Sequence, residues 1–350
     1  MIKPEKLSTG DVVALVNPAG MLPERFSRQL EFIKKYLVQE GLKVRDYIAY
    51  TDYSYPNVRV DFLHAAFSDP DVKAIFPICG SNKIYEILPL LNYNLITNNP
   101  KIICGYSDLS ALILVINELA GIITFFGPHL NFINDKSSKR ENLFTIKSFW
   151  NMLFWKKSGT NGLSKNEAFN FFRVLDENQL IIRNIYSSTE RIKNINWRDN
   201  VFVNLNAKEK ITGQICCLSL DALLKIIELQ IHIDLSKKLV FLDTLNATFK
   251  EALEKIKKIS SHTNIRDANA IIFSSMSERT DGEKLISVDL KKPINIKLFL
   301  QKVYDITGGN NILFGFPIGH CSYKLTIPIG IKAMLDVNLG EILLLEKPFK

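Results

Sequence analysis

Ser107 lies in a turn between two apolar segments, and its surroundings are typical of a nucleophilic serine. Residues 101–104 are typical of a short buried strand, and residues 108–120 form a largely apolar segment of helical length. A tight strand-to-helix turn exposes a serine, and the helix N-terminus offers backbone N–H groups and a positive dipole end to an oxyanion. Leu109 stands where the G-x-S-x-G motif has its second glycine. Two interpretations stay open: Ser107 is a nucleophile, or it is the N-cap of the helix.

Gly80 lies in a second turn, which could supply a backbone donor to the same chemistry. It follows the strand-like segment 74–78 and precedes Ser81 and Asn82. A glycine there lets the backbone approach a ligand closely or present an N–H group to an oxyanion. The alternative is an ordinary turn between a strand and a helix.

His320 and Asp243 are the candidate base and acid. His320 follows the buried strand expected at 311–315, which ends at Gly315, and a loop that contains Gly319. Loops at sheet edges often carry general bases. Asp243 ends the strand expected at 239–242, where a carboxylate can orient a histidine. The alternatives are a surface histidine and an aspartate that caps the next helix or faces solvent. His129, which follows Gly127-Pro128, is the second candidate base.

Motifs for metals and cofactors are missing from the sequence. There is no H-E-x-x-H motif, no cysteine cluster and no glycine-rich nucleotide-binding loop, so neither a metal nor a cofactor is expected. The five cysteines include no C-x-x-C pair, which argues against a disulfide framework. Cys216 and Cys217 stand in an apolar run and are predicted to be buried core.

Composition narrows the class of protein and its location. The chain has 350 residues and a formal net charge of +8, but its basic residues are mixed with acidic ones. Binding to nucleic acid would need a basic cluster, so no nucleic-acid partner is expected. The N-terminus has no signal-like apolar stretch, and no apolar run reaches the ~18 residues of a membrane span. We therefore expect a cytoplasmic protein without a membrane partner.

Segments typical of strands and helices alternate through the first part of the chain. This alternation predicts an α/β fold with a mostly parallel sheet that is covered on both faces. Residues 1–150 are expected to form an N-terminal α/β domain with the nucleophile elbow. Residues 151–210 are polar with little periodicity, and are predicted to be a linker and mobile loop region. Residues 211–350 are expected to form a C-terminal domain that carries the acid and the histidine.

Taken together and in chain order, several motifs resemble those of the LD-carboxypeptidase family of serine peptidases, in particular its microcin C immunity branch. The motifs that carry the resemblance are Leu7-Ser8-Thr9-Gly10-Asp11, Ala66-Phe67-Ser68-Asp69-Pro70, Gly80-Ser81-Asn82, Leu88-Pro89-Leu90-Leu91-Asn92-Tyr93, Gly105-Tyr106-Ser107-Asp108, Phe241-Leu242-Asp243, Gly319-His320 and Ile327-Pro328-Ile329-Gly330. The resemblance implies a Rossmann-like N-terminal domain, a swivelling β/α C-terminal domain, an active site in the interdomain cleft, and a homodimer.

The resemblance also implies roles for five residues. Ser107 would be the nucleophile, His320 the general base and Asp243 the orienting acid, with an oxyanion hole made by the backbone N–H groups of Gly80 and Asp108. Three departures set this chain apart. Asp243 stands where the family usually has Glu, Cys79 replaces a glycine, and Cys217-Leu218-Ser219 replaces Gly-Gly-Asn.

The expected function is a serine hydrolase that cleaves an amide bond near a free carboxylate. The expected substrate is a peptidoglycan-derived peptide or a peptidyl-nucleotide antibiotic. Trp197 could stack on a nucleobase, or could serve as a hydrophobic anchor. One alternative is an acyltransferase that uses the same Ser–His site with an amine acceptor. The other is a degenerate, non-catalytic member that binds peptides.

Overall fold

The chain divides into two compact units. Unit 1 comprises Met1–Lys156, Thr326–Gly330 and Pro348–Lys350, and unit 2 comprises Lys157–Leu325 and Ile331–Lys347. From the sequence we expect contiguous domains, whereas here two late segments, Thr326–Gly330 and Pro348–Lys350, belong to unit 1. The computed structural model describes residues 1–20, 27–130, 140–155, 172–174, 180–183, 203–205, 208–245, 247–274, 293–309, 311–321, 324–337 and 341–350. Trp197 lies outside the described residues.

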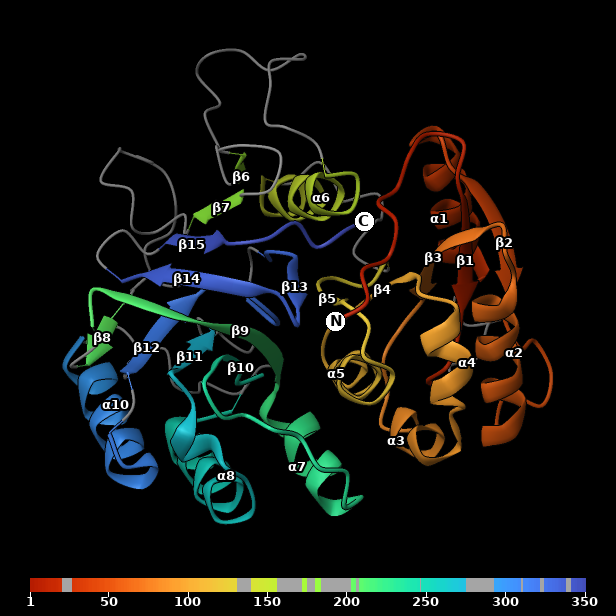
Figure 1. The fold of residues 1–350 in the computed structure, drawn as a ribbon. Coiled ribbons are helices and arrows are strands. Elements are labelled where there is room, and N and C mark those ends of the chain that lie inside the picture. The colour runs from red at the N-terminus through yellow and green to blue at the C-terminus, as the bar shows by residue number, and fades with distance from the viewer. Residues whose placement is uncertain are drawn as a thin grey trace. The chain divides into compact units, whose positions relative to one another are not determined.

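Unit 1 is built on a sheet with the strand order β13-β5-β4-β3-β1-β2 (Figure 1). Its strands are β1 (Val12–Val16), β2 (Lys43–Tyr47), β3 (Val72–Pro77), β4 (Ile102–Gly105), β5 (Thr124–Phe126) and β13 (Ile327–Ile329). Strands β1 to β5 pair in parallel, and β13 adds to β5 antiparallel. Every residue of β4 is buried, as expected for a parallel strand covered on both faces. The carboxyl ends of β1, β3, β4 and β5 therefore share one edge of this sheet.

Helices alternate with these strands along the chain. The helices of unit 1 are α1 (Ser27–Gln39), α2 (Pro56–Ser68), α3 (Ile84–Ile87), the short 3-10 helix η2 (Leu88–Leu90), α4 (Tyr93–Asn98), α5 (Leu109–Ala120) and α6 (Arg140–Leu153). Helix α5 is apolar over most of its surface and is almost entirely buried. It ends at Gly121, whose φ of +68° is a left-handed conformation that glycine adopts without steric cost.

Unit 2 is built on a mixed sheet with the order β6-β7-β15-β14-β9-β10-β11-β12-β8. Its strands are β6 (Phe172–Val174), β7 (Leu180–Arg183), β8 (Val203–Leu205), β9 (Lys210–Ser219), β10 (Lys238–Asp243), β11 (Ala270–Ser274), β12 (Asn311–Phe316), β14 (Lys332–Asp336) and β15 (Glu341–Leu344). The four strands β9 to β12 are parallel, so their carboxyl ends share one edge of the sheet. Antiparallel strands extend the sheet on both sides of these four.

Three longer helices cover one face of the sheet of unit 2, as Figure 1 shows. They are α7 (Leu220–Glu228), α8 (Phe249–His262) and α10 (Pro293–Thr307), and a short 3-10 helix η5 (Ile265–Asp267) follows α8. Helix α8 begins with a capping box in which Thr248 and Glu251 satisfy each other's backbone N–H groups. The capping box fixes the start of α8 shortly after Asp243.

The polar region 151–210 contributes to the sheet of unit 2. Strands β6, β7 and β8 all come from it, although its sequence shows little periodicity. Each has three or four residues, too few for an alternating pattern to stand out. Most of the remaining positions in this region lie outside the described residues. Within the described part of the chain, no helix is long and apolar enough to cross a membrane.

Candidate active site

Ser107 occupies a strained turn between β4 and α5. Its φ is +58°, a left-handed conformation that costs a non-glycine residue roughly 1–2 kcal/mol. The Ser107 carbonyl accepts hydrogen bonds from the backbone N–H of Ser110 at 2.9 Å and from the Ser110 hydroxyl at 2.5 Å. The N-cap position belongs to Asp108, and no side chain caps the helix. The Ser107 side chain therefore does not cap α5, and the backbone conformation is that of a nucleophile elbow.

Gly105 and Leu109 explain how the turn departs from the G-x-S-x-G motif. A Cβ atom on Gly105 would lie 2.8 Å from the Leu109 Cβ, so only glycine fits before the elbow. Leu109 is fully buried, and its side chain lies between the end of β4 and the turn at Gly80. A large residue at the second glycine position thus packs beneath the turn instead of preventing it.

The turn at Gly80 lies beside the start of α5. A Cβ on Gly80 would lie 3.7 Å from the Leu109 Cγ, and Leu109 directly follows Asp108. Within the described part of the chain, no residue accepts a hydrogen bond from the backbone N–H of Gly80 or of Asp108. Two neighbouring backbone N–H groups without an internal acceptor can receive an oxyanion. The role of these two residues as an oxyanion hole stays a prediction.

A buried arginine, which the sequence did not single out, holds the Gly80 turn. The guanidinium of Arg59 on α2 donates to the carbonyls of Pro18 at 3.0 Å and of Lys83 at 2.8 Å. The Ser81 hydroxyl donates to the Ala19 carbonyl at 2.6 Å. These bonds tie the segment after β3 to the segment after β1, so the Gly80 backbone is supported from both sides.

Cys79 precedes Gly80 at the position where the family usually has glycine. Its side chain is buried, and burial raises the pKa of the thiol to about 12. A thiol with this pKa stays protonated at neutral pH and is a poor nucleophile. Ser107 is therefore the better candidate nucleophile of unit 1.

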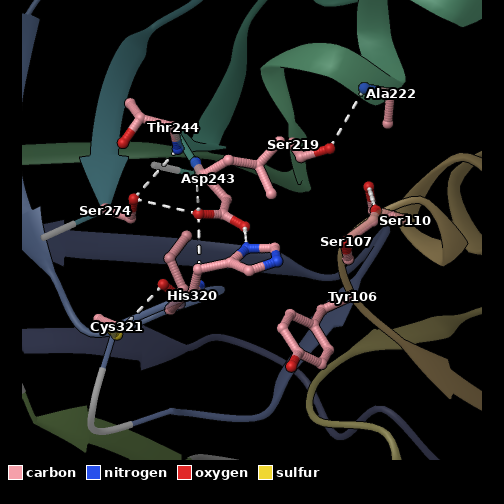
Figure 2. A network of polar contacts seen from close by, with 12 residues as sticks. Tyr106, Ser107, Ser110, Ser219, Ala222, Asp243, Thr244, Ser274, His320 and Cys321 are labelled. Atoms are coloured by element: carbon pink, nitrogen blue, oxygen red, sulfur yellow. Dashed lines mark hydrogen bonds and ion pairs between the residues drawn. The ribbon is translucent and has the colours of Figure 1, made fainter. Parts of the chain in front are cut away.

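Asp243 and His320 contact each other in unit 2, as Figure 2 shows. His320 Nδ1 lies 2.6 Å from Asp243 Oδ2, and the Asp243 side chain is 1% exposed, whereas that of His320 is 23% exposed. The other carboxylate oxygen, Oδ1, accepts from the backbone N–H of Leu245 at 3.1 Å and of His320 at 3.4 Å. Ser274 Oγ lies 3.4 Å from the same oxygen. The carboxylate is thus held by several donors, with one oxygen directed at the imidazole.

Gly319 explains how the short aspartate reaches the histidine. A Cβ on Gly319 would lie 2.1 Å from the Asp243 Cγ and 2.3 Å from its Oδ2, so the carboxylate occupies the space that any side chain at position 319 would need. Gly319 also has φ of +71°, which favours glycine. The missing methylene of Asp relative to Glu is thereby offset by the close approach of the Gly319-His320 backbone.

Replacing Gly319 by alanine is expected to displace the Asp243 carboxylate. We expect covalent labelling of Ser107 by a fluorophosphonate to become about 100-fold slower, because small misplacements in a catalytic site lower the reaction rate by about that factor. Gly308→Ala is the matched control. Gly308 has φ of +76° at the opposite end of β12, and no atom lies within 4 Å of the position of its Cβ. Equal labelling rates in the two variants would show that the close approach at Gly319 is unimportant.

The other parallel strands of unit 2 place polar residues beside Asp243. Ser219 on β9 is in register with Asp243, and its hydroxyl accepts from the Ala222 N–H at 3.2 Å, capping α7. Ser274 ends β11, the strand between β10 and β12, and the sequence did not single it out. The sequence feature that could have identified Ser274 is its place as a polar residue at the end of a buried strand, which it shares with Asp243. Cys216 and Cys217 are fully buried, so the prediction of buried core is confirmed.

The predicted site residues fall into two groups, one in each unit. Ser107, Asp108 and Gly80 lie together at the carboxyl edge of the sheet of unit 1, and Asp243 and His320 at that of unit 2. His129, the second candidate base, lies in unit 1 next to Tyr106. Among the described residues, no group of three or more His, Cys, Asp or Glu side chains could hold a metal ion.

Family models for both halves of an LD-carboxypeptidase match this chain. The model of the LD-carboxypeptidase N-terminal domain matches residues 13–127, and that of the C-terminal domain matches residues 212–335. Together they span more than half of the chain and include Gly80, Ser107, Asp108, Asp243 and His320.

Curated relatives and solved structures are similar over nearly the whole chain. A probable murein peptide carboxypeptidase of Bacillus subtilis is 24% identical over 340 residues, covering 95% of this chain and 91% of that protein. The microcin C7 self-immunity protein MccF of Escherichia coli is 25% identical over 366 residues, covering 97% and 95%. A structure of MccF in complex with glutamyl sulfamoyl guanosine has a TM-score of 0.74 and 21% identity, with all of both chains covered.

These similarities confirm the predicted fold class, a two-domain α/β architecture, and the predicted resemblance. The family supports an activity as a peptide hydrolase. With both domain models matched in order along one chain, this protein belongs to the LD-carboxypeptidase family.

Proposed function

We propose that this protein is a serine hydrolase that cleaves an amide bond near a free carboxylate, with Ser107, His320 and Asp243 as its catalytic triad. The observation that carries the proposal is the hydrogen bond of 2.6 Å between the buried Asp243 and His320 Nδ1. A carboxylate accepts a hydrogen bond from the N–H at Nδ1, so it selects the tautomer in which Nε2 can act as a base. The left-handed φ of Ser107 supports the proposal independently.

The mechanism follows from these roles. Ser107 Oγ attacks the carbonyl carbon of the scissile amide and passes its proton to His320 Nε2, while Asp243 stabilises the imidazolium that forms. The backbone N–H groups of Gly80 and Asp108 donate to the oxyanion of the tetrahedral intermediate. His320 then gives the proton to the leaving nitrogen, and the C–N bond breaks to leave an ester on Ser107. Water attacks this ester by the same route, which releases a carboxylic acid and restores Ser107.

Two substrate classes are proposed. One is a peptidoglycan-derived tetrapeptide that ends in D-alanine, because a relative is named as a murein peptide carboxypeptidase. The other is a peptidyl or aminoacyl nucleotide, because a similar structure holds glutamyl sulfamoyl guanosine. Both present an amide-type bond near a charged group. The net charge of +8 would suit carboxylate or phosphate groups if the basic residues gather at the site.

The test is to incubate the purified protein with each substrate in ¹⁸O-labelled water and to identify the products by mass spectrometry. Hydrolysis places one ¹⁸O atom in the product carboxylate, whereas transfer to an added amine gives an unlabelled amide. Labelling of Ser107 by a fluorophosphonate, located by peptide mapping, reports the nucleophile without reference to the substrate. If the protein shows no turnover and Ser107 is not labelled, the hydrolase proposal is wrong, and a non-catalytic peptide-binding protein is favoured.

The proposal also includes a cytoplasmic location, a homodimer and no nucleic-acid partner. Cell fractionation with an antibody tests the location, and analytical ultracentrifugation tests the dimer. In an electrophoretic mobility-shift assay, binding to duplex DNA with an affinity that falls steeply with salt would contradict the absence of a nucleic-acid partner.

A further inference from the structure

His129 contacts the turn of unit 1 that carries Ser107. Strands β4 and β5 pair in parallel with Gly105 opposite Phe126, and the Gly127 N–H donates to the Gly105 carbonyl at 3.1 Å. The chain after β5 therefore continues alongside the chain after β4. His129 Nε2 lies 2.9 Å from the carbonyl oxygen of Tyr106, the residue before Ser107. A carbonyl oxygen only accepts, so Nε2 carries the proton and donates it.

This hydrogen bond acts on the strained dihedral angle of Ser107. The angle φ of Ser107 is the rotation between the Tyr106–Ser107 peptide and the Ser107 carbonyl carbon. His129 holds the peptide on one side of this rotation, and Ser110 holds the Ser107 carbonyl on the other through its N–H and its hydroxyl. With both sides held, the left-handed φ of +58° persists without a glycine.

The His129 ring also borders the second half of the proposed oxyanion hole. Its centroid lies 4.3 Å from that of the Tyr106 ring, and its Cε1 would lie 3.3 Å from a Cβ on Gly80. The His129 residue is only 5% exposed, and its ring lies close to both turns. One imidazole thus supports the backbone that precedes Ser107 and the backbone of Gly80.

We propose that His129 is a positioning residue, which holds the Ser107 turn and the Gly80 turn in the relative arrangement that the oxyanion hole requires. This inference rests on the proposed function, because it assigns a role within that reaction. It gives His129 a role other than the general base that the sequence also allowed. The Nε2 proton is donated to a backbone carbonyl, so the ring acts through geometry rather than through proton transfer.

Three substitutions separate the hydrogen bond from the ring. His129→Phe keeps a ring against Tyr106 and removes the donor, His129→Gln keeps a donor and removes the ring, and His129→Ala removes both. We expect the second-order rate of fluorophosphonate labelling at Ser107 to fall 10- to 100-fold in His129→Phe and in His129→Ala. We expect His129→Gln to recover part of the rate, because its amide can donate to the same carbonyl.

The control is His64→Phe. His64 on α2 is also in unit 1 and forms a hydrogen bond between its Nε2 and the backbone N–H of Asn92 at 3.0 Å. The variant thus loses one hydrogen bond between a histidine and the backbone that involves neither the Ser107 turn nor the Gly80 turn. We expect Ser107 in this variant to be labelled at the wild-type rate. Labelling is measured at a temperature at which circular dichroism shows that each variant is folded.

A second measurement keeps this inference distinct from the proposed function. Amide hydrogen exchange of Ser110, whose N–H donates to Ser107, reports the turn whether or not the protein is an enzyme. We expect exchange at Ser110 to be at least 10-fold faster in His129→Phe and unchanged in His64→Phe. If wild type is labelled and His129→Phe is labelled equally fast, the inference is wrong. If the wild-type protein is not labelled, the proposed function fails, and hydrogen exchange alone tests the role of His129. Unchanged exchange at Ser110 in His129→Phe refutes this role, and faster exchange supports it.

Discussion

Ser107→Ala is expected to lower kcat for amide hydrolysis about a millionfold, as loss of the nucleophile does in other serine hydrolases. KM should stay close to its wild-type value, because the oxyanion donors and the remainder of the site stay in place. The measurement is single-turnover mass spectrometry with a murein tetrapeptide and with glutamyl sulfamoyl guanosine. Ser68→Ala, which removes an exposed hydroxyl at the end of α2, is the control for unit 1.

A second variant at this position separates chemistry from conformation. Ser107→Gly also removes the nucleophile, but glycine adopts a φ of +58° without the steric cost that alanine bears. We expect the free energy of unfolding of Ser107→Gly to exceed that of Ser107→Ala by about 1 kcal/mol. Retained hydrolysis in either variant would remove Ser107 from the mechanism, and equal stabilities would argue against the strained elbow.

Asp243→Asn is expected to lower kcat about 10⁴-fold. An asparagine amide can donate to His320 Nδ1, which stabilises the tautomer with its proton on Nε2 and removes the base. The contact distance of 2.6 Å and the burial of Asp243 mean that water cannot easily take over the lost role. Kinetics with the same two substrates, over a range of pH, measure the loss.

Two further variants bracket this result. Asp243→Glu restores the residue usual in the family, but its longer side chain meets the crowded backbone at Gly319, so we expect activity between that of wild type and that of Asp243→Asn. Asp221→Asn, which breaks an ion pair of 2.6 Å with Lys255 on the surface of the same unit, should leave kcat unchanged. Wild-type turnover by Asp243→Asn would show that His320 needs no orienting acid.

The sequence predicted the parts of the fold that have strong local signals. Continuous apolar runs such as Val12–Val16 and Ile102–Gly105 are buried parallel strands, and the apolar segment at 109–120 is a buried helix. Strands β6, β7 and β8 were not expected in the polar region 151–210, because three or four residues are too few for a periodic signal. The return of Thr326–Gly330 to unit 1 depends on an antiparallel pairing with β5, which has no local signal at all.

The chemistry-bearing residues show the same division. By itself, the sequence determined which residue types follow buried strands: Ser107 after β4, Asp243 at the end of β10 and His320 after β12. Only the tertiary structure decided which of them touch. The bond between Asp243 and His320 joins residues that are 77 positions apart, and Gly319 matters because the Asp243 carboxylate takes the place of its missing side chain.

His129 and Ser274 illustrate why the sequence could not assign every role. His129 follows a Gly-Pro pair and resembled a candidate base, but its hydrogen bond to the Tyr106 carbonyl arises from the parallel register of β4 and β5. Ser274 meets Asp243 because β11 lies between β10 and β12 in the sheet. Burial and secondary structure depend on local patterns of residue type, whereas strand order and register depend on pairing between distant segments, and these place one side chain against another.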